Sequence, residues 1–273
     1  MKHSIFILTI AAALVLPQSA LASATGTRHQ EEPIFIESIE LEDDRKRDNW
    51  AGRFSLGLLY APIFPGSSEQ TVRLAPDIKF NYRDLFFVEN TSIGSVIYKQ
   101  RLVRAGIIGR FSIGRPNGLP VVNLDNIKGI GEAFEVGVFA GTSLYKLFVT
   151  AEAYFDVSGV HGGASVELEG GYTFELNSNF KFTPVIGALW GSRNYLQTYF
   201  ETPGDSESFQ AKAGVYEMFG EAALEQRLSE KWLIKGTARL SYLVGSSARS
   251  PVVLSGAGSR VQLASFIALV KLF

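Results

Sequence analysis

The last residues of the chain constrain its fold more than any other feature. The stretch from Val261 to Phe273 is apolar, loosely alternating, and ends on an aromatic residue. Bacterial outer-membrane barrels commonly end in this way, and a strand of about 9–11 residues crosses the bilayer core only when every backbone group is paired. We therefore predict a closed transmembrane sheet, with Phe273 as part of the signal that the barrel-assembly machinery reads.

The first residues predict export. Lys2 is followed by an apolar run from Ile5 to Leu16, and Ala20-Leu21-Ala22 offers a small-residue cleavage site. We expect a signal peptide over residues 1–22, with cleavage at residue 24 as the alternative, and a mature protein in the outer membrane. No other apolar run approaches the roughly 18 residues of a transmembrane helix.

Composition excludes several classes of function. The chain has no cysteine, so disulfides and Cys–metal sites are ruled out, and three histidines leave little for a His-based metal site. A net charge of −1 gives no overall positive potential that would attract nucleic acid. We expect no cofactor and no nucleic-acid partner. The 20 Phe and 10 Tyr suit aromatic girdles in contact with outer-membrane lipid.

Alternation of apolar and polar residues predicts the strands. It is cleanest over 72–83, 165–176, 216–228 and 234–242, where apolar residues occupy most of the alternate positions. This period of two indicates strands with one apolar face. A soluble sandwich has the same period, and the two chain ends are what favour a membrane barrel.

Loop lengths predict the strand count and the orientation. Short links near residues 99–101, 144–146, 176–179 and 229–231 alternate with longer links over 114–133, 158–163, 199–214 and 245–258. Short turns are typical of the periplasmic side. We expect strands at roughly 101–114, 134–143, 146–158, 163–176, 179–196, 215–229, 231–245 and 259–273. A first strand ahead of Ala61–Ser68 and the strand over 72–83 precede these. Splitting 85–99 into Leu85–Glu89 and Ile93–Tyr98 then gives an all-β barrel of twelve strands over residues 50–273, with ten as the alternative.

The polar faces of these strands predict what fills the lumen. The candidate lumen charge network consists of Arg73, Asp77, Lys79, Glu167, Glu169, Glu221, Glu225, Lys235 and Arg239. Large side chains of both signs can cross-link a narrow barrel. We expect a salt-bridged interior, and a conducting pore lined by the same charges remains the alternative.

Residues 23–49 form a separate, acidic segment. Charge at this density with few apolar residues is typical of a disordered tail, which the topology places in the periplasm. Within it, Pro33–Leu41 has enough β-forming residues to add to the sheet edge of a partner. The candidate periplasmic partner contact consists of Ile34, Phe35, Ile36, Ile39 and Leu41.

His161 raises the question of an enzyme. Asp156 and Ser158 lie close to it in sequence, and some outer-membrane barrels hydrolyse lipids with a Ser–His–acid site. Side chains at a hairpin tip rarely converge as a triad needs, because successive strand residues point to opposite faces. We expect a polar loop turned by Gly159, Gly162 and Gly163, and no enzyme; a lipid-modifying barrel is the less favoured alternative.

Four segments carry a resemblance to a known family. They are Ala61–Ser68, Leu124–Gly137, Asp156–Gly163 and Ser250–Val253, in family order from about Trp50 to Phe273. On these segments the chain resembles the MltA-interacting protein (MipA)/OmpV family of outer-membrane proteins. The resemblance implies a non-enzymatic barrel that acts as a scaffold linking a lytic transglycosylase, a murein hydrolase, to a murein synthase. Other members of that family imply a porin-like channel or an adhesin as the alternative.

Overall fold

The structure is a closed antiparallel β-barrel. It is a computed structural model that describes residues 50–83, 85–115, 129–201 and 209–273. The strands are β1 (Trp50–Pro62), β2 (Gln70–Tyr82), β3 (Phe86–Glu89), β4 (Ser92–Lys99), β5 (Val103–Ser112), β6 (Ala133–Leu144), β7 (Leu147–Asp156), β8 (Ala164–Tyr172), β9 (Phe174–Asn177), β10 (Phe180–Gly191), β11 (Gly214–Arg227), β12 (Trp232–Leu243) and β13 (Val261–Leu272). Three short helices are α3 (Arg193–Phe200), η1 (Ser247–Arg249) and α4 (Pro251–Leu254).

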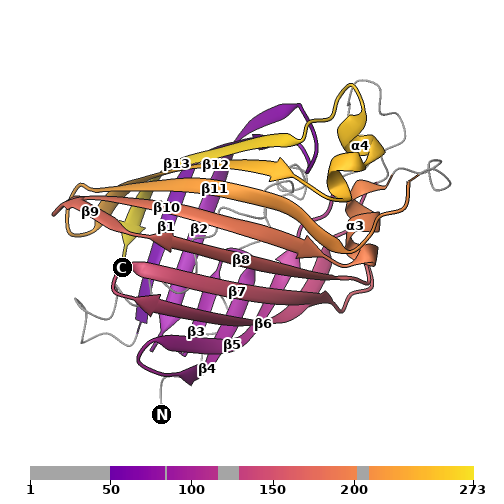
Figure 1. The fold of residues 1–273 in the computed structure, drawn as a ribbon. Coiled ribbons are helices and arrows are strands. Elements are labelled where there is room, and N and C mark those ends of the chain that lie inside the picture. The colour runs from indigo at the N-terminus through magenta and orange to yellow at the C-terminus, as the bar shows by residue number, and fades with distance from the viewer. Residues whose placement is uncertain (1–49, 84, 116–128, 202–208) are drawn as a thin grey trace, which may run out of the picture.

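These strands occupy twelve positions around the barrel. β8 and β9 share one position, because both pair with β10 and only Thr173 separates them. Each strand otherwise pairs with the next in sequence, and β1 pairs with β13 to close the circle. The prediction of twelve strands is confirmed over the alternative of ten. Figure 1 shows the strands wrapped around one axis.

The predicted division of residues 85–99 is also confirmed. β3 and β4 form a short hairpin whose turn contains Asn90, a residue with a left-handed φ of 48°. The Asn90 backbone N–H donates to the Ile78 carbonyl, and its side-chain oxygen accepts from the Ile78 N–H. Asparagine tolerates this φ, so one residue both turns the chain and ends the pairing of β3 with β2.

The exterior of the barrel is an apolar belt. The outward residues of β2 include Val72 and Leu74, which are well exposed, whereas Asp77 and Lys79 point inward. The same division holds along β12, where Leu240 is exposed and Arg239 is buried. An apolar outer face with a polar inner face is the pattern of a transmembrane β-barrel. Among the helices of the described ranges, none has the length and hydropathy of a membrane span.

The two ends of the barrel differ in their connections. The turns that follow β2, β4, β6, β9 and β11 are short and share one end, the short-turn end, with Trp50 and Phe273. The opposite, long-loop end holds α3, α4 and η1. In Figure 1, α3 and α4 lie at the right and the C-terminus at the left. One strand boundary was wrong: we expected a strand to residue 196, but β10 ends at Gly191 and the chain turns into α3 at a capping serine.

Candidate functional site in a plugged barrel

Helix α3 plugs the long-loop end. Ser192 caps it, because its side-chain oxygen accepts from the Tyr195 backbone N–H. The helix buries one face, made of Tyr195, Leu196, Tyr199 and Phe200. These side chains pack against inward residues of the barrel wall in one buried cluster, which includes Phe148, Val185, Leu189, Tyr216, Phe219 and Leu243. The mouth of the barrel therefore contains a hydrophobic core of its own.

The segment before β13 completes this plug. Ser250 caps α4 by accepting from the Val252 N–H at 3.1 Å, and Pro251 follows at a position where its missing N–H costs nothing. The Ser250 hydroxyl also donates to the carbonyl of Phe200 at the end of α3. Val253 joins the cluster around α3. The two loops thus support each other inside the mouth.

Arg115 lies beside the plug on the chain that follows β5. Its guanidinium donates to the Tyr199 carbonyl at 3.3 Å and lies 5.5 Å from the centre of the Phe64 ring. Burial lowers the pKa of Arg115 to about 10, so the side chain is still cationic at neutral pH. A buried charge in this place ties the loop after β5 to the plug helix.

The loop around His161 does not form a catalytic triad. The Asp156 carboxylate accepts from the hydroxyl and N–H of Ser158 and from the N–H groups of Gly159, His161 and Gly162. The Ser158 hydroxyl therefore faces Asp156, and it accepts from the Phe134 N–H. Asp156 organises the loop, which leaves the serine without a histidine base.

His161 turns inward and meets a buried ion pair. Its Nδ1 accepts from the Gly163 N–H at 3.1 Å, which assigns the proton of the neutral ring to Nε2. Nε2 lies 3.3 Å from Glu135 Oε1, and Glu135 Oε2 accepts from Arg110 at 3.0 and 3.1 Å. The rings of Tyr195 and His161 meet edge to face at 5.2 Å. This arrangement connects the loop after β7, the wall and α3.

Several predicted lumen charges contact partners on neighbouring strands. Lys79 Nζ lies 3.3 Å from Glu89, and Asp77 lies 3.6 Å from Arg53. The Arg239 guanidinium lies 3.4 Å from Glu217 and 3.9 Å from Glu221, and stacks 3.2 Å above the Phe219 ring. Such pairs cross-link adjacent strands from the inside.

The other predicted lumen residues also face inward. Glu225 is the register partner of Lys235 on β12. Glu169 accepts from the Thr150 hydroxyl at 3.0 Å, and Glu167 is the register partner of Glu152 on β7. Arg73 is half-buried on the inner face of β2. Sequence reasoning missed Arg53, Glu89, Arg110 and Glu135, although each stands at an inward position of its strand.

Phe273 lies at the seam that closes the barrel. Its backbone N–H donates to the Gly52 carbonyl at 2.9 Å, so the last residue continues the pairing of β13 with β1. Lys271 Nζ lies 5.4 Å from the Phe273 ring centre and 5.7 Å from that of Trp232. The two aromatic rings flank this cation at the short-turn end.

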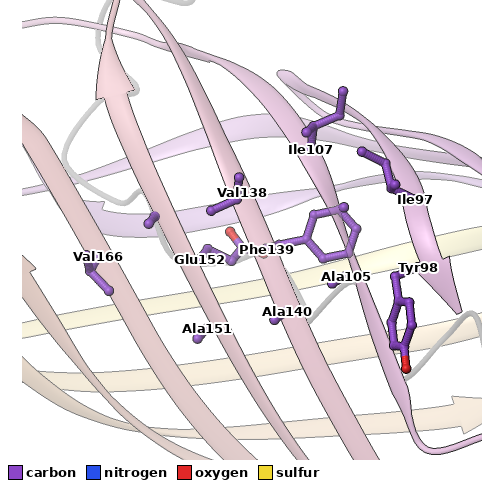
Figure 2. A pocket seen from close by; sticks show the side chains of 12 residues that line it. Ile97, Tyr98, Ala105, Ile107, Val138, Phe139, Ala140, Ala151, Glu152 and Val166 are labelled. Atoms are coloured by element: carbon purple, nitrogen blue, oxygen red, sulfur yellow. The ribbon is translucent and has the colours of Figure 1, made fainter. Parts of the chain in front are cut away.

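The outer wall has a shallow apolar groove of about 510 Å³ over β4 to β8. Its floor is a row of small residues that are partners in register, Ala105, Ala140 and Ala151. Ile107 and Val138 flank this row, and Tyr98 stands at one end (Figure 2). Phe139 and Glu152 belong to the inward parity of their strands and line the groove from its base. The groove is part of the lipid-facing belt.

Two predictions lie outside the described residues. These are the signal peptide over 1–22 and the tail contact formed by Ile34, Phe35, Ile36, Ile39 and Leu41. Within the described ranges, no group of three or more His, Asp or Glu side chains is arranged to hold a metal ion.

Comparisons with known proteins give one family and several barrels. The family model described as "MltA-interacting protein MipA" matches residues 54–273. No curated protein matches the sequence. Among solved structures, the translocator domain of the autotransporter NalP from Neisseria meningitidis is 8% identical, with 86% of this chain and 92% of that chain covered and a TM-score of 0.42. An outer membrane channel from Pseudomonas putida F1 is 8% identical, with 83% and 97% covered and a TM-score of 0.41. The outer membrane channel DcaP of Acinetobacter baumannii is 8% identical, with 82% and 96% covered and a TM-score of 0.39. At these values the three likenesses do not bear on function.

Proposed function

We propose a function from two premises: the chain belongs to the MltA-interacting protein MipA family, and it is an outer-membrane β-barrel protein. The proposed function is a non-enzymatic scaffold that links a lytic transglycosylase to a murein synthase at the outer membrane. In this role the barrel is the anchor and the segments at the short-turn end recruit the partners.

The observation that carries this proposal is the filled mouth of the barrel. The core around α3 occupies the long-loop end. Below it, ion pairs such as Lys79–Glu89 and Arg239–Glu217 link neighbouring strands on the inner face of the barrel. A barrel filled in this way favours anchoring over transport, because side chains in lumen and mouth leave little room for a solute. The geometry around Asp156 and Ser158 supports the absence of catalysis.

The partner surfaces follow from the orientation. If the short turns face the periplasm, as in other outer-membrane barrels, the tail at residues 23–49 enters the barrel from the compartment that contains murein. Ile34, Phe35, Ile36, Ile39 and Leu41 remain the proposed partner contact. Phe273, at the seam, remains the proposed signal for the assembly machinery.

A pull-down from envelope extracts tests the scaffold. The full mature protein should recover a lytic transglycosylase and a murein synthase, and deletion of residues 25–49 should abolish that recovery without changing heat-modifiable migration on a gel. Arg249→Gln, at the exposed long-loop end, is the matched control and should recover both enzymes. Equal recovery with and without the tail would contradict the scaffold.

A channel is the second candidate function. Glu167 and Glu169 are only half-buried in the lumen, so water reaches part of the interior. Planar-bilayer recordings separate the two functions. The scaffold predicts little conductance, whereas large and steady cation-selective currents that fall in Glu169→Gln would favour the channel.

A further inference from the structure

The short-turn end carries an excess of basic side chains. In the described turns and adjoining strand ends, two acidic residues, Glu175 and Glu230, stand against seven basic residues with exposed side chains: Arg83, Lys99, Arg101, Lys146, Arg227, Lys231 and Lys271. Lys181 and Glu225 are register partners that face the lumen, and their opposite charges cancel. The excess at this end is thus five positive charges. Asp84, which lies outside the described residues, follows Arg83 in the sequence and lowers this excess to four. We call these seven residues the basic rim.

The long-loop end shows no such excess. Its described loops hold Arg115, Arg193, Lys212, Arg249 and Arg260 against Glu69, Glu132, Asp156 and Glu201, which nearly balance. The positive charge is therefore gathered at the end where the chain enters the barrel.

Part of the basic rim surrounds that entry point. Trp50 begins β1, and its ring centre lies 4.4 Å from that of Tyr82. The Arg83 guanidinium lies 5.3 Å from the Tyr82 ring centre on one side. On the other side, β13 pairs with both β1 and β12, so Lys271 is the register partner of Phe54 and of Trp232. Any segment that precedes Trp50 leaves the barrel between cations.

The segment that precedes Trp50 has the opposite charge. From Glu31 to Asp44 the sequence contains seven carboxylates and no lysine or arginine. Only Arg45–Asn49 separates this acidic block from Trp50. At about 3.3 Å per residue, that link spans up to roughly 20 Å, and the block itself has the length to cross several turns of the rim.

We propose that the acidic block Glu31–Asp44 docks on the basic rim of its own barrel. Each exposed ion pair contributes little, but the covalent link keeps the block at a high effective concentration, and several pairs act together. The inference rests on the proposed scaffold in one respect. The block also contains Ile34, Phe35 and Ile39 of the proposed partner contact, so a partner must displace the block from the rim to bind these residues. Docking on the rim would therefore cover the residues of the tail that are proposed to bind the partner.

Distances between paired spin labels test the docking. The chain has no cysteine, so Ser38→Cys in the tail and Ser229→Cys in the turn after β11 provide unique sites. We expect a short, narrow distance distribution at low salt that lengthens and broadens in 1 M NaCl, where the Debye length falls to about 3 Å. The control pair, Ser38→Cys with Ser68→Cys at the long-loop end, should be long at both salts. Identical distributions at both salts for the first pair would overturn docking by charge.

A charge swap separates docking from a general effect of salt. Arg101→Glu, Arg227→Glu and Lys231→Glu together should release the tail, as should Glu40→Lys, Glu42→Lys and Asp43→Lys together, and combining the two sets should restore the short distance. On protein lacking residues 25–49, the rim triple variant should bind a peptide of residues 31–44 at least about tenfold more weakly. Lys212→Glu with Arg249→Glu at the other end should leave peptide affinity unchanged. No restoration in the combined variant would contradict the proposal.

One further outcome identifies another occupant of the rim. Loss of the short distance in nanodiscs that contain anionic phospholipid, with retention in zwitterionic nanodiscs, would assign the rim to lipid phosphates and overturn the docking. Partner recovery in pull-downs distinguishes this proposal from the scaffold. Docking with no partner recovery would refute the scaffold alone, whereas tail-dependent recovery without any tail–rim contact would refute the docking alone.

Discussion

The two ends of this barrel are stabilised in different ways. At the long-loop end, α3 and α4 place apolar and aromatic side chains inside the mouth, and the ion pair there, between Arg110 and Glu135, is buried. At the short-turn end, the turns are tight and their charges are exposed, and the ion pair between Lys146 and Glu175, at 2.9 Å, is open to solvent. Since burial decides what a polar contact contributes, mutations at the first end should be costly and mutations at the second nearly silent.

The largest effect is expected at Glu135. Its replacement by alanine leaves Arg110 and His161 buried without their shared carboxylate, and breaking a buried ion pair costs about 3–5 kcal/mol. Urea unfolding of protein folded into lipid vesicles, followed by tryptophan fluorescence, measures the loss. The double variant Arg110→Met, Glu135→Leu should recover much of the stability, because no charge is then left unpaired. If Glu135→Ala lowers the free energy of unfolding by no more than the loss of an exposed ion pair does, the Arg110–Glu135 pair must be hydrated.

Leu196→Ala, in the plug, should cause the second-largest loss of stability. Leu196 is fully buried in the cluster around α3, and truncation of such a residue costs about 2–5 kcal/mol. The same variant should raise conductance in planar bilayers if the plug is what closes the mouth. Ile186→Ala, on the exposed lipid face of β10, is the matched control and should change neither measurement by much. Unchanged conductance combined with lost stability would place the barrier to ions deeper in the lumen.

Ser192→Ala should have an intermediate effect. The Ser192 hydroxyl oxygen accepts from Tyr195 at the start of α3 and from the Ala164 N–H at 2.8 Å, so its loss removes a helix cap worth about 1 kcal/mol. Ser192→Asp can still cap the helix and should retain most of the stability. Equal losses in the two variants would mean that side-chain volume, rather than capping, matters at this position.

The smallest effect is expected for Lys146→Gln. Lys146 and Glu175 are exposed, and such pairs contribute little because water and salt screen them. The urea midpoint should stay within experimental error at both low and high salt. A clear drop at low salt would show that the short-turn end, like the mouth, depends on its ion pairs.

The sequence by itself determined the class of fold and favoured twelve strands over ten. A period of two assigns inward and outward positions wherever one face meets lipid, which is why Asp77, Lys79 and Arg239 were predicted to face the lumen. The tight links between apolar runs mark the end that Trp50 and Phe273 share. Asn90, a residue that tolerates a left-handed φ, marked the break between β3 and β4.

The tertiary structure alone decided which groups meet. Arg110 and Glu135 are 25 residues apart, and they meet because β5 and β6 pair in a register that places them side by side. The inward fold of α3 depends on the space that a twelve-strand barrel leaves at its mouth, which no local pattern encodes. The sequence predicted Tyr195 at the end of a strand and Phe200 in a loop, and only closure of the sheet around them supplies the partners that make them a core.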